Sequence, residues 1–215
     1  MPSIVIPSGA SLPFYMDQSD RQYIVVGGTQ VTGGSLGIVE ESPVSGNALA
    51  IHGSVEITGA AALDLYGDGT SVTVGGTARI EGGASAIRLA GAGQSLVNAG
   101  QLVSQTNAVE VVADLGLDFD ITNTGTVHGG EAAFFLTGEG AFTNNGRIEG
   151  ASGIYWYDSS SSAATMFSSI RRASSGGLSK ATKATMSSPS TRPGPSSSKQ
   201  PARATTPSRR VSATP

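Results

Sequence analysis

Three aspartates near the middle of the chain have the residue type and spacing of a calcium site. Asp114, Asp118 and Asp120 lie within residues 113–121, where polar and apolar residues alternate. Calcium takes six to eight oxygen ligands, which carboxylates supply. On an extended segment Asp118 and Asp120 share one face, whereas Asp114 need not join them. The alternative is a solvated acidic face, so the three residues are only a candidate calcium site.

Chemistry on carbohydrates would need clustered carboxylates, often with a basic residue near the reacting sugar. Residues 1–157 contain four basic side chains, which are Arg21, Arg79, Arg88 and Arg147. His128 and Glu149 are expected to face each other on the outer surface, but no third group accompanies them. We interpret this pair as a surface contact. The sequence therefore predicts no catalytic residue, and a carbohydrate-active enzyme remains an alternative.

Three asparagines recur at one position of a repeated motif. Asn98, Asn123 and Asn144 each stand four residues before an apolar residue, and a glycine follows each asparagine two residues later. Stacked asparagine amides can hydrogen-bond along a repeat and satisfy turn backbone groups. We predict a structural asparagine ladder. The following glycines, Gly100, Gly125 and Gly146, are expected to have positive φ at the same corner.

The asparagines belong to a repeat that spans most of the chain. Its marker is an apolar residue, a variable residue and usually glycine, with spacings of 26, 23, 22, 25 and 21 residues. The marker residues are Val31, Ile57, Ile80, Leu102, Val127 and Ile148. A repeat of this length indicates stacked structural units, and it is too short for a four-stranded propeller blade.

Short apolar alternations interrupted by glycine predict an all-β fold, a single-stranded parallel β-helix (β-solenoid) of about six coils of 21–26 residues. At about 4.8 Å for each coil, the rod would be about 29 Å long. The predicted core is Ile57, Leu63, Leu65, Ile80, Ile87, Leu89, Leu102, Val109, Val111, Val127, Phe134, Leu136, Ile148, Ile154 and Trp156.

Residues between the core columns are expected to face outward. One predicted outward column contains Gly37, Asp64, Arg88, Glu110, Phe135 and Tyr155. It would place Arg88 between Asp64 and Glu110, and opposite charges on neighbouring strands contribute about 0.2–1 kcal/mol for each pair. The column would then continue with two aromatic rings. With Tyr157 these rings could stack on a sugar, or they could cover the surface near the last coil.

Charge divides the chain into two parts. Residues 1–157 have 15 acidic and four basic side chains, whereas residues 158–215 have nine basic side chains and one acidic side chain. An acidic body argues against nucleic acid as a partner, because phosphate binding needs a basic surface. The chain has no cysteine, which excludes disulfides and thiolate chemistry. No apolar run approaches the roughly 20 residues of a membrane-spanning helix.

Residues outside the repeat differ at the two ends. Residues 1–26 are expected to form a capping segment, and residues 27–157 the solenoid repeats. Residues 158–215 are rich in serine, proline and arginine, and we predict that they are disordered. Because the repeat stops in mid-coil, we also consider that this tail is read out of frame. An uncapped last coil would invite self-association through its exposed strand edges.

The repeated text Asn-x-Gly-x-Ile-x-Gly, followed by Ala-Ile-x-Leu and Gly-x-Gly, resembles β-solenoid regions of large bacterial exported proteins. These include autotransporter-type adhesins and the N-terminal parts of hemolysin-type (RTX) calcium-binding proteins. The resemblance covers about residues 3–157. It implies export without an N-terminal signal peptide, by a type I-like route. The calcium-binding nonapeptide of the RTX family, Gly-Gly-x-Gly-x-Asp-x-apolar-x, does not occur.

These observations favour a non-enzymatic β-solenoid segment that is secreted or at the cell surface and has a structural or adhesive role. Its expected partners are carbohydrate or protein surfaces of a host or matrix, with no cofactor other than the candidate calcium. A calcium-binding RTX-type fragment and a carbohydrate-active β-helix lyase or hydrolase are the two alternatives.

Overall fold

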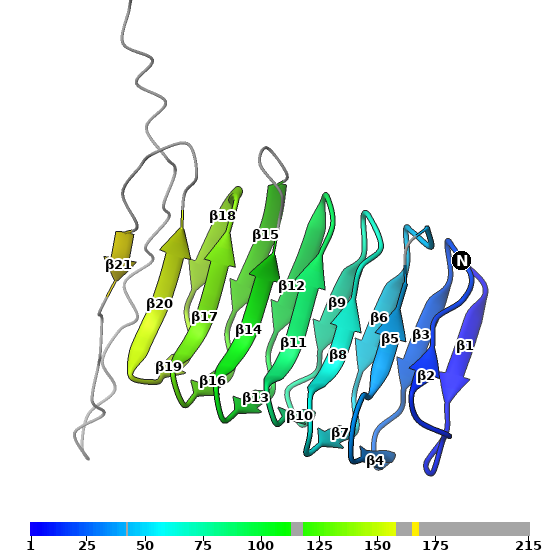
Figure 1. Ribbon diagram of the computed structural model, residues 1–215. Helices are drawn as coiled ribbons and strands as arrows, with labels where there is room; N and C mark the ends of the chain where they lie inside the picture. The colour runs from blue at the N-terminus through cyan, green and yellow to red at the C-terminus, as the bar shows by residue number, and fades with distance from the viewer. Residues whose placement is uncertain (42, 113–117, 158–164, 168–215) are drawn as a thin grey trace, which may run out of the picture.

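The chain folds as an all-β parallel solenoid of about six coils (Figure 1). The computed structural model describes residues 1–41, 43–112, 118–157 and 165–167. Its strands form three sheets, which we call A, B and C, along the sides of a rod. The all-β solenoid prediction is confirmed.

Sheet A has seven parallel strands: β1 (Ser3–Ile6), β3 (Gln22–Val25), β6 (Ala48–Ile51), β9 (Ser71–Val74), β12 (Gln94–Asn98), β15 (Asp118–Asn123) and β18 (Glu139–Asn144). Sheet C has six: β4 (Gln30–Gly33), β7 (Ser54–Ile57), β10 (Arg79–Gly82), β13 (Gln101–Ser104), β16 (Thr126–Gly129) and β19 (Arg147–Glu149).

Sheet B has eight strands: β2 (Phe14–Tyr15), β5 (Ile38–Glu40), β8 (Ala61–Leu65), β11 (Ser85–Ala90), β14 (Asn107–Val112), β17 (Ala132–Thr137), β20 (Ser152–Tyr157) and β21 (Thr165–Phe167). Each full coil passes through sheets A, C and B in turn. Each strand inside a sheet therefore pairs with the strands one coil before and after it, and equivalent residues form columns along the rod.

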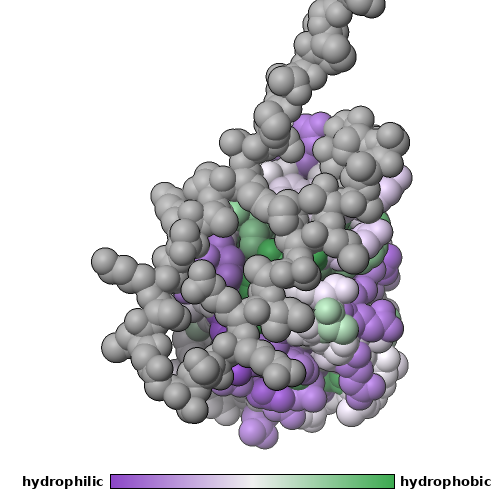
Figure 2. All heavy atoms as spheres, turned by 90° about the vertical axis from the view of Figure 1, so that its left-hand side faces the viewer, coloured by the Kyte–Doolittle hydropathy of each residue, from purple (hydrophilic) through white to green (hydrophobic). Residues whose placement is uncertain are grey.

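The core lies between the three sheets and follows the predicted inward columns. From Leu63 to Leu136 the predicted core residues are at most about 1% exposed. Burying one such side chain contributes about 1.5–3 kcal/mol. In the last coil Ile154 is still 9% exposed, and Ile148 and Trp156 are only partly buried. Figure 2 looks onto this end and shows hydrophobic residues at its centre and hydrophilic residues around them.

One marker of the predicted repeat is wrong by two residues. Val31 and Ile80 pair with Val55, whereas Ile57 pairs with the glycines Gly33 and Gly82. In this coil an isoleucine, Ile57, stands in the column that holds glycine in the neighbouring coils. Ile57 and Gly59 therefore match the apolar-x-glycine pattern by chance, two residues after the true marker Val55. Ile57 nevertheless points inward and is 1% exposed, so its place in the predicted core is confirmed.

Described residues on both sides of the predicted repeats join the sheets. Within the predicted cap, β1 pairs with β3 and β2 pairs with β5, so residues 1–26 continue the stack as a shorter first coil. Within the segment predicted to be disordered, β21 pairs antiparallel with β20. The remaining residues of 158–215 lie outside the described residues, as does the prediction of disorder for them.

Candidate functional site

The outer face of sheet B carries the predicted charged column. Arg88 pairs in register with Asp64 on one side and with Glu110 on the other. Its Nη1 lies 3.7 Å from Oδ1 of Asp64 and donates a hydrogen bond to the hydroxyl of Tyr66. The guanidinium carbon also lies 5.1 Å from the centre of the Tyr66 ring, a cation–π arrangement. The column thus holds Arg88 in a fixed position.

Burial raises the pKa of two groups next to Arg88, the column residue Asp64 and the nearby Tyr66. The Asp64 side chain is only 13% exposed, and this desolvation raises its pKa although the charge of Arg88 acts to lower it. Burial also raises the pKa of Tyr66, and the nearby Asp64 carboxylate adds to that rise. Glu110 is part-buried and accepts a hydrogen bond from the hydroxyl of Ser85 at 3.2 Å.

The first member of the predicted column is wrong. Val39, and not Gly37, pairs with Asp64, and Tyr15 precedes Val39 in the same column. Val39 lies eight residues after the marker Val31, as Arg88 does after Ile80, whereas Gly37 lies only six residues after it. Val39 is 4% exposed, whereas Tyr15 is 50% exposed. Between β2 and β20 the outward column therefore runs from one tyrosine, Tyr15, to another, Tyr155.

The other end of the column is an aromatic stack. Phe135 pairs in register with Tyr155, and their ring centroids are 5.1 Å apart at an interplanar angle of 6°. One face of each ring is therefore covered by the other ring. Tyr157 follows in the next outward column of β20 and is 44% exposed. This geometry favours contact through ring edges and the Tyr157 side chain over sugar stacking between the two rings.

The three predicted asparagines lie together inside the corner between sheets A and C. Nδ2 of Asn98 donates to Oδ1 of Asn123 at 2.8 Å, and Nδ2 of Asn123 donates to Oδ1 of Asn144 at 2.7 Å. Asn98 and Asn123 are fully buried. Oδ1 of Asn98 also accepts the backbone N–H of Gly100. These bonds satisfy buried amides across three coils, as a structural ladder requires.

The predicted positive φ at Gly100, Gly125 and Gly146 is wrong, since these three are not among the glycines with positive φ. Glycine is needed there for close approach between coils. A Cβ on Gly125 would overlap the carbonyl oxygen of Gly100, and one on Gly146 would overlap that of Gly125. The corner is therefore packed backbone against backbone.

Two predicted calcium ligands point outward from β15. Asp118 and Asp120 are exposed, while Asp114 lies outside the described residues. Asp118 pairs in register with Glu139 of β18, so two carboxylates are neighbours on this face. Among the residues that the structure describes, no group of three acidic, histidine or cysteine side chains could hold a metal ion.

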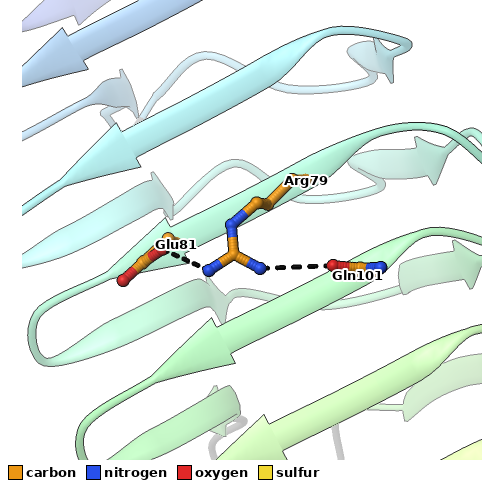
Figure 3. Close-up of polar contacts among 3 residues, drawn as sticks. All are labelled: Arg79, Glu81 and Gln101. Atoms are coloured by element: carbon orange, nitrogen blue, oxygen red, sulfur yellow. Dashed lines mark hydrogen bonds and ion pairs between the residues drawn. The ribbon is translucent and has the colours of Figure 1, made fainter.

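Sheet C carries polar contacts on its outer face. Nδ1 of His128 lies 3.5 Å from Oε2 of Glu149, which is the predicted surface pair, and Arg147 forms an ion pair with the same carboxylate. Figure 3 shows a similar group on the neighbouring strands β10 and β13 of the same sheet. There the Arg79 guanidinium donates hydrogen bonds to Glu81 at 2.6 Å and to Gln101 at 3.2 Å. These groups lie side by side on a sheet and pair with one another.

A buried carboxylate was missed by the sequence analysis. Glu40 is fully buried at the end of β5, in the inward column of Leu65. Its oxygens accept hydrogen bonds from Asn47 Nδ2 at 2.7 Å, Thr70 Oγ1 at 2.7 Å and the backbone N–H of Gly67 at 3.2 Å. Glu40 lies nine residues after Val31, as Leu89 does after Ile80, so extending this inward column to the coil of Val31 would have shown an acidic residue in it. Glu40 joins the turns of two neighbouring coils.

Comparisons with known proteins add no family. A scan against family models found no match, and searches of curated proteins and of solved structures found no significant similarity. In the part of the chain that the structure describes, no helix is long and apolar enough to cross a membrane. On the basis of its own geometry, the chain is a parallel β-solenoid of about six coils.

Proposed function

We propose that this chain is a non-enzymatic β-solenoid segment that acts outside the cell or at its surface as a structural and adhesive element. Its binding surface is the outer face of sheet B, from Tyr66 and Arg88 through Glu110 to the aromatic end at Tyr155 and Tyr157. The partner is an extended carbohydrate or a protein surface of a host or matrix.

The observation that carries the proposal is the order of side chains on this face. Parallel strands about 4.8 Å apart place hydrogen-bonding and aromatic groups in one line. Arg88 and Glu110 can donate to and accept from hydroxyl or amide groups, and Tyr157 offers an exposed aromatic surface. An extended ligand lying along the rod would meet these groups in succession.

The arrangement of charged groups supports a binding role over catalysis. Arg88 lies between two carboxylates and against a tyrosine, and His128 lies beside a carboxylate that Arg147 also contacts. Each of these side chains is paired on an open sheet face. General acid–base catalysis instead needs a group held within hydrogen-bond reach of a reacting atom.

Binding of the full chain to immobilised neutral and acidic polysaccharides and to matrix proteins tests the proposal. Glu110→Gln and Tyr157→Ser should weaken the interaction about tenfold each, which corresponds to a loss of about 1.4 kcal/mol. Glu81→Gln on sheet C is the matched control and should leave binding unchanged. Equal binding by all three variants, or no binding by the wild type, would contradict the assignment.

Two further measurements separate the alternatives. Release of reducing sugar ends from a bound polysaccharide would overturn the non-enzymatic role. A higher unfolding midpoint in calcium than in chelator would favour the calcium-binding alternative, because a ligand of the native state stabilises it. Substitution of Asp118 and Asp120 by asparagine would show whether those residues carry such an effect.

A further inference from the structure

The outer face of sheet A differs from the other two faces in charge. Its first five strands, β1, β3, β6, β9 and β12, contain no acidic or basic residue. Sheets B and C carry charged side chains on strands of the same coils, such as Arg88 of β11 and Glu81 of β10. The uncharged face thus belongs to a body with 15 acidic and four basic side chains in residues 1–157.

The central column of this face consists of β-branched residues and alanine. In register along the rod it contains Val5, Ile24, Ala50, Thr73, Val97, Thr122 and Thr143. Val5 is 54% exposed and Val97 is 46% exposed. The neighbouring outward column of the same strands contains Ser3, Gln22, Ala48, Ser71 and Ser95. The face therefore combines apolar side chains with uncharged hydroxyl and amide groups.

Charge returns only in the last two strands of sheet A. Asp118 and Asp120 lie on β15, Glu139 lies on β18, and the three form no ion pair with any residue that the structure describes. Asp118 and Glu139 are also direct neighbours, and like charges at that position repel. This face therefore has an uncharged part and an acidic end.

We propose that the outer face of sheet A binds a second copy of this chain, face to face, with the two rods running in opposite directions. Two acidic bodies repel each other least across the face that lacks charge. Opposite directions place the acidic end of each copy against β1 and β3 of the other, whereas parallel rods would oppose the two acidic ends. A two-fold axis that lies between the two faces and runs parallel to β9 produces this arrangement, because β9 is the middle strand of the seven.

The size of the face determines the strength of this pairing. Seven strands about 4.8 Å apart, each with about four residues at 3.3 Å, give a footprint of roughly 400 Å² for each copy. Stable protein pairs bury about 800 Å² of surface on each partner. The dimer is therefore weak, forms at high protein concentration, and is independent of the sheet B binding surface.

Sedimentation of the full chain over a range of concentrations tests the pairing. We expect concentration-dependent dimers that Val97→Lys abolishes, since the new charges would meet an uncharged surface. Val103→Lys is the matched control, because Val103 faces outward from β13 of sheet C in the same coil. Loss of association in both variants, or in neither, would overturn the assignment, as would a monomeric wild type at every concentration.

Salt distinguishes this contact from an electrostatic one. Dimers through sheet A should persist or strengthen as salt rises, because salt screens the repulsion between two acidic bodies. Association that disappears in salt would instead indicate pairing between the acidic body and basic residues of 158–215, and would overturn the proposal.

Cross-linking tests the direction of the rods. The chain has no cysteine, so single cysteines can be introduced without competing thiols. Thr73→Cys lies at the predicted axis and should cross-link to itself through a short thiol-reactive linker. Thr143→Cys should cross-link to Val5→Cys in a mixture and not to itself. Self-cross-linking of Thr143→Cys without that of Thr73→Cys would show that the predicted arrangement is wrong.

Discussion

At the scale of single residues, polar groups inside the solenoid are satisfied by their neighbours along the stack. Glu40 accepts three hydrogen bonds in the core, and Asn98 and Asn123 form a ladder of amides. Such groups are costly to bury without partners, typically about 1–3 kcal/mol for each unsatisfied group. Their positions at the corners show how a long apolar core can still contain carboxyl and amide side chains.

The raised pKa of Asp64 predicts a pH dependence of stability. The folded state holds this proton more tightly than the unfolded chain, in which the pKa is near 3.8. Stability should therefore fall as the pH rises from 3.8 toward the higher folded pKa, and this contribution is constant above it. Asp64→Asn lacks this titration. Urea unfolding of both proteins between about pH 3 and pH 7 measures it, and identical pH profiles would contradict the prediction.

The asparagine ladder could be predicted from sequence, whereas the Glu40 network could not. Asn98, Asn123 and Asn144 keep one distance from the marker, so their common column is visible in the text. Glu40 lies in the coil of Val31, for which no inward residue of the Leu65 column was predicted. Its partners Asn47 and Thr70 come from turns of different length, which no fixed spacing brings together.

At the scale of elements, the fold depends on short strands that repeat in register with tight corners between them. Two of the three sheets follow directly from the repeat columns. The strands of sheet A are harder to predict, because the connection from sheet B varies in length. It is one residue, Gly138, between β17 and β18, but residues 41–47 separate β5 from β6. Local alternation without constant spacing gives no repeat signal.

Close approach between coils predicts a large difference between two glycine substitutions. Gly125→Ala should destabilise the fold by about 1–3 kcal/mol, because its Cβ would overlap the carbonyl oxygen of Gly100 in the preceding coil. Gly34→Ala is the control, since a Cβ there meets nothing within 4 Å. Denaturant unfolding of the two variants measures the difference. Similar losses of stability would show that the coils can separate at this corner.

At the scale of the whole molecule, the solenoid has a protected middle and less protected ends. Each coil contacts the coils before and after it, so its stability comes mainly from nearest neighbours. Core residues are almost fully buried in the middle coils, but Ile148 and Trp156 are only partly buried in the last coil. The number of coils followed from the repeat, whereas β21 in the serine-rich tail had no repeat signal.

Hydrogen exchange should follow this gradient. Backbone amides of β9, β10 and β11 should exchange more slowly than those of β18 and β19, because the latter lack a complete coil beyond them among the described residues. Mass spectrometry after deuterium labelling of the full chain measures each segment. Equal protection along the rod would indicate that the solenoid opens as a single cooperative unit.

The in-register stacking of equivalent residues also determines how such a chain can change during evolution. Duplication of one coil would present to each neighbour the kind of surface that it already contacts, and would lengthen the rod by about 4.8 Å. Short insertions would instead fall at the variable connection between sheets B and A. Rod length and corner loops can therefore diverge by separate genetic events, one by recombination of whole units and the other by small insertions.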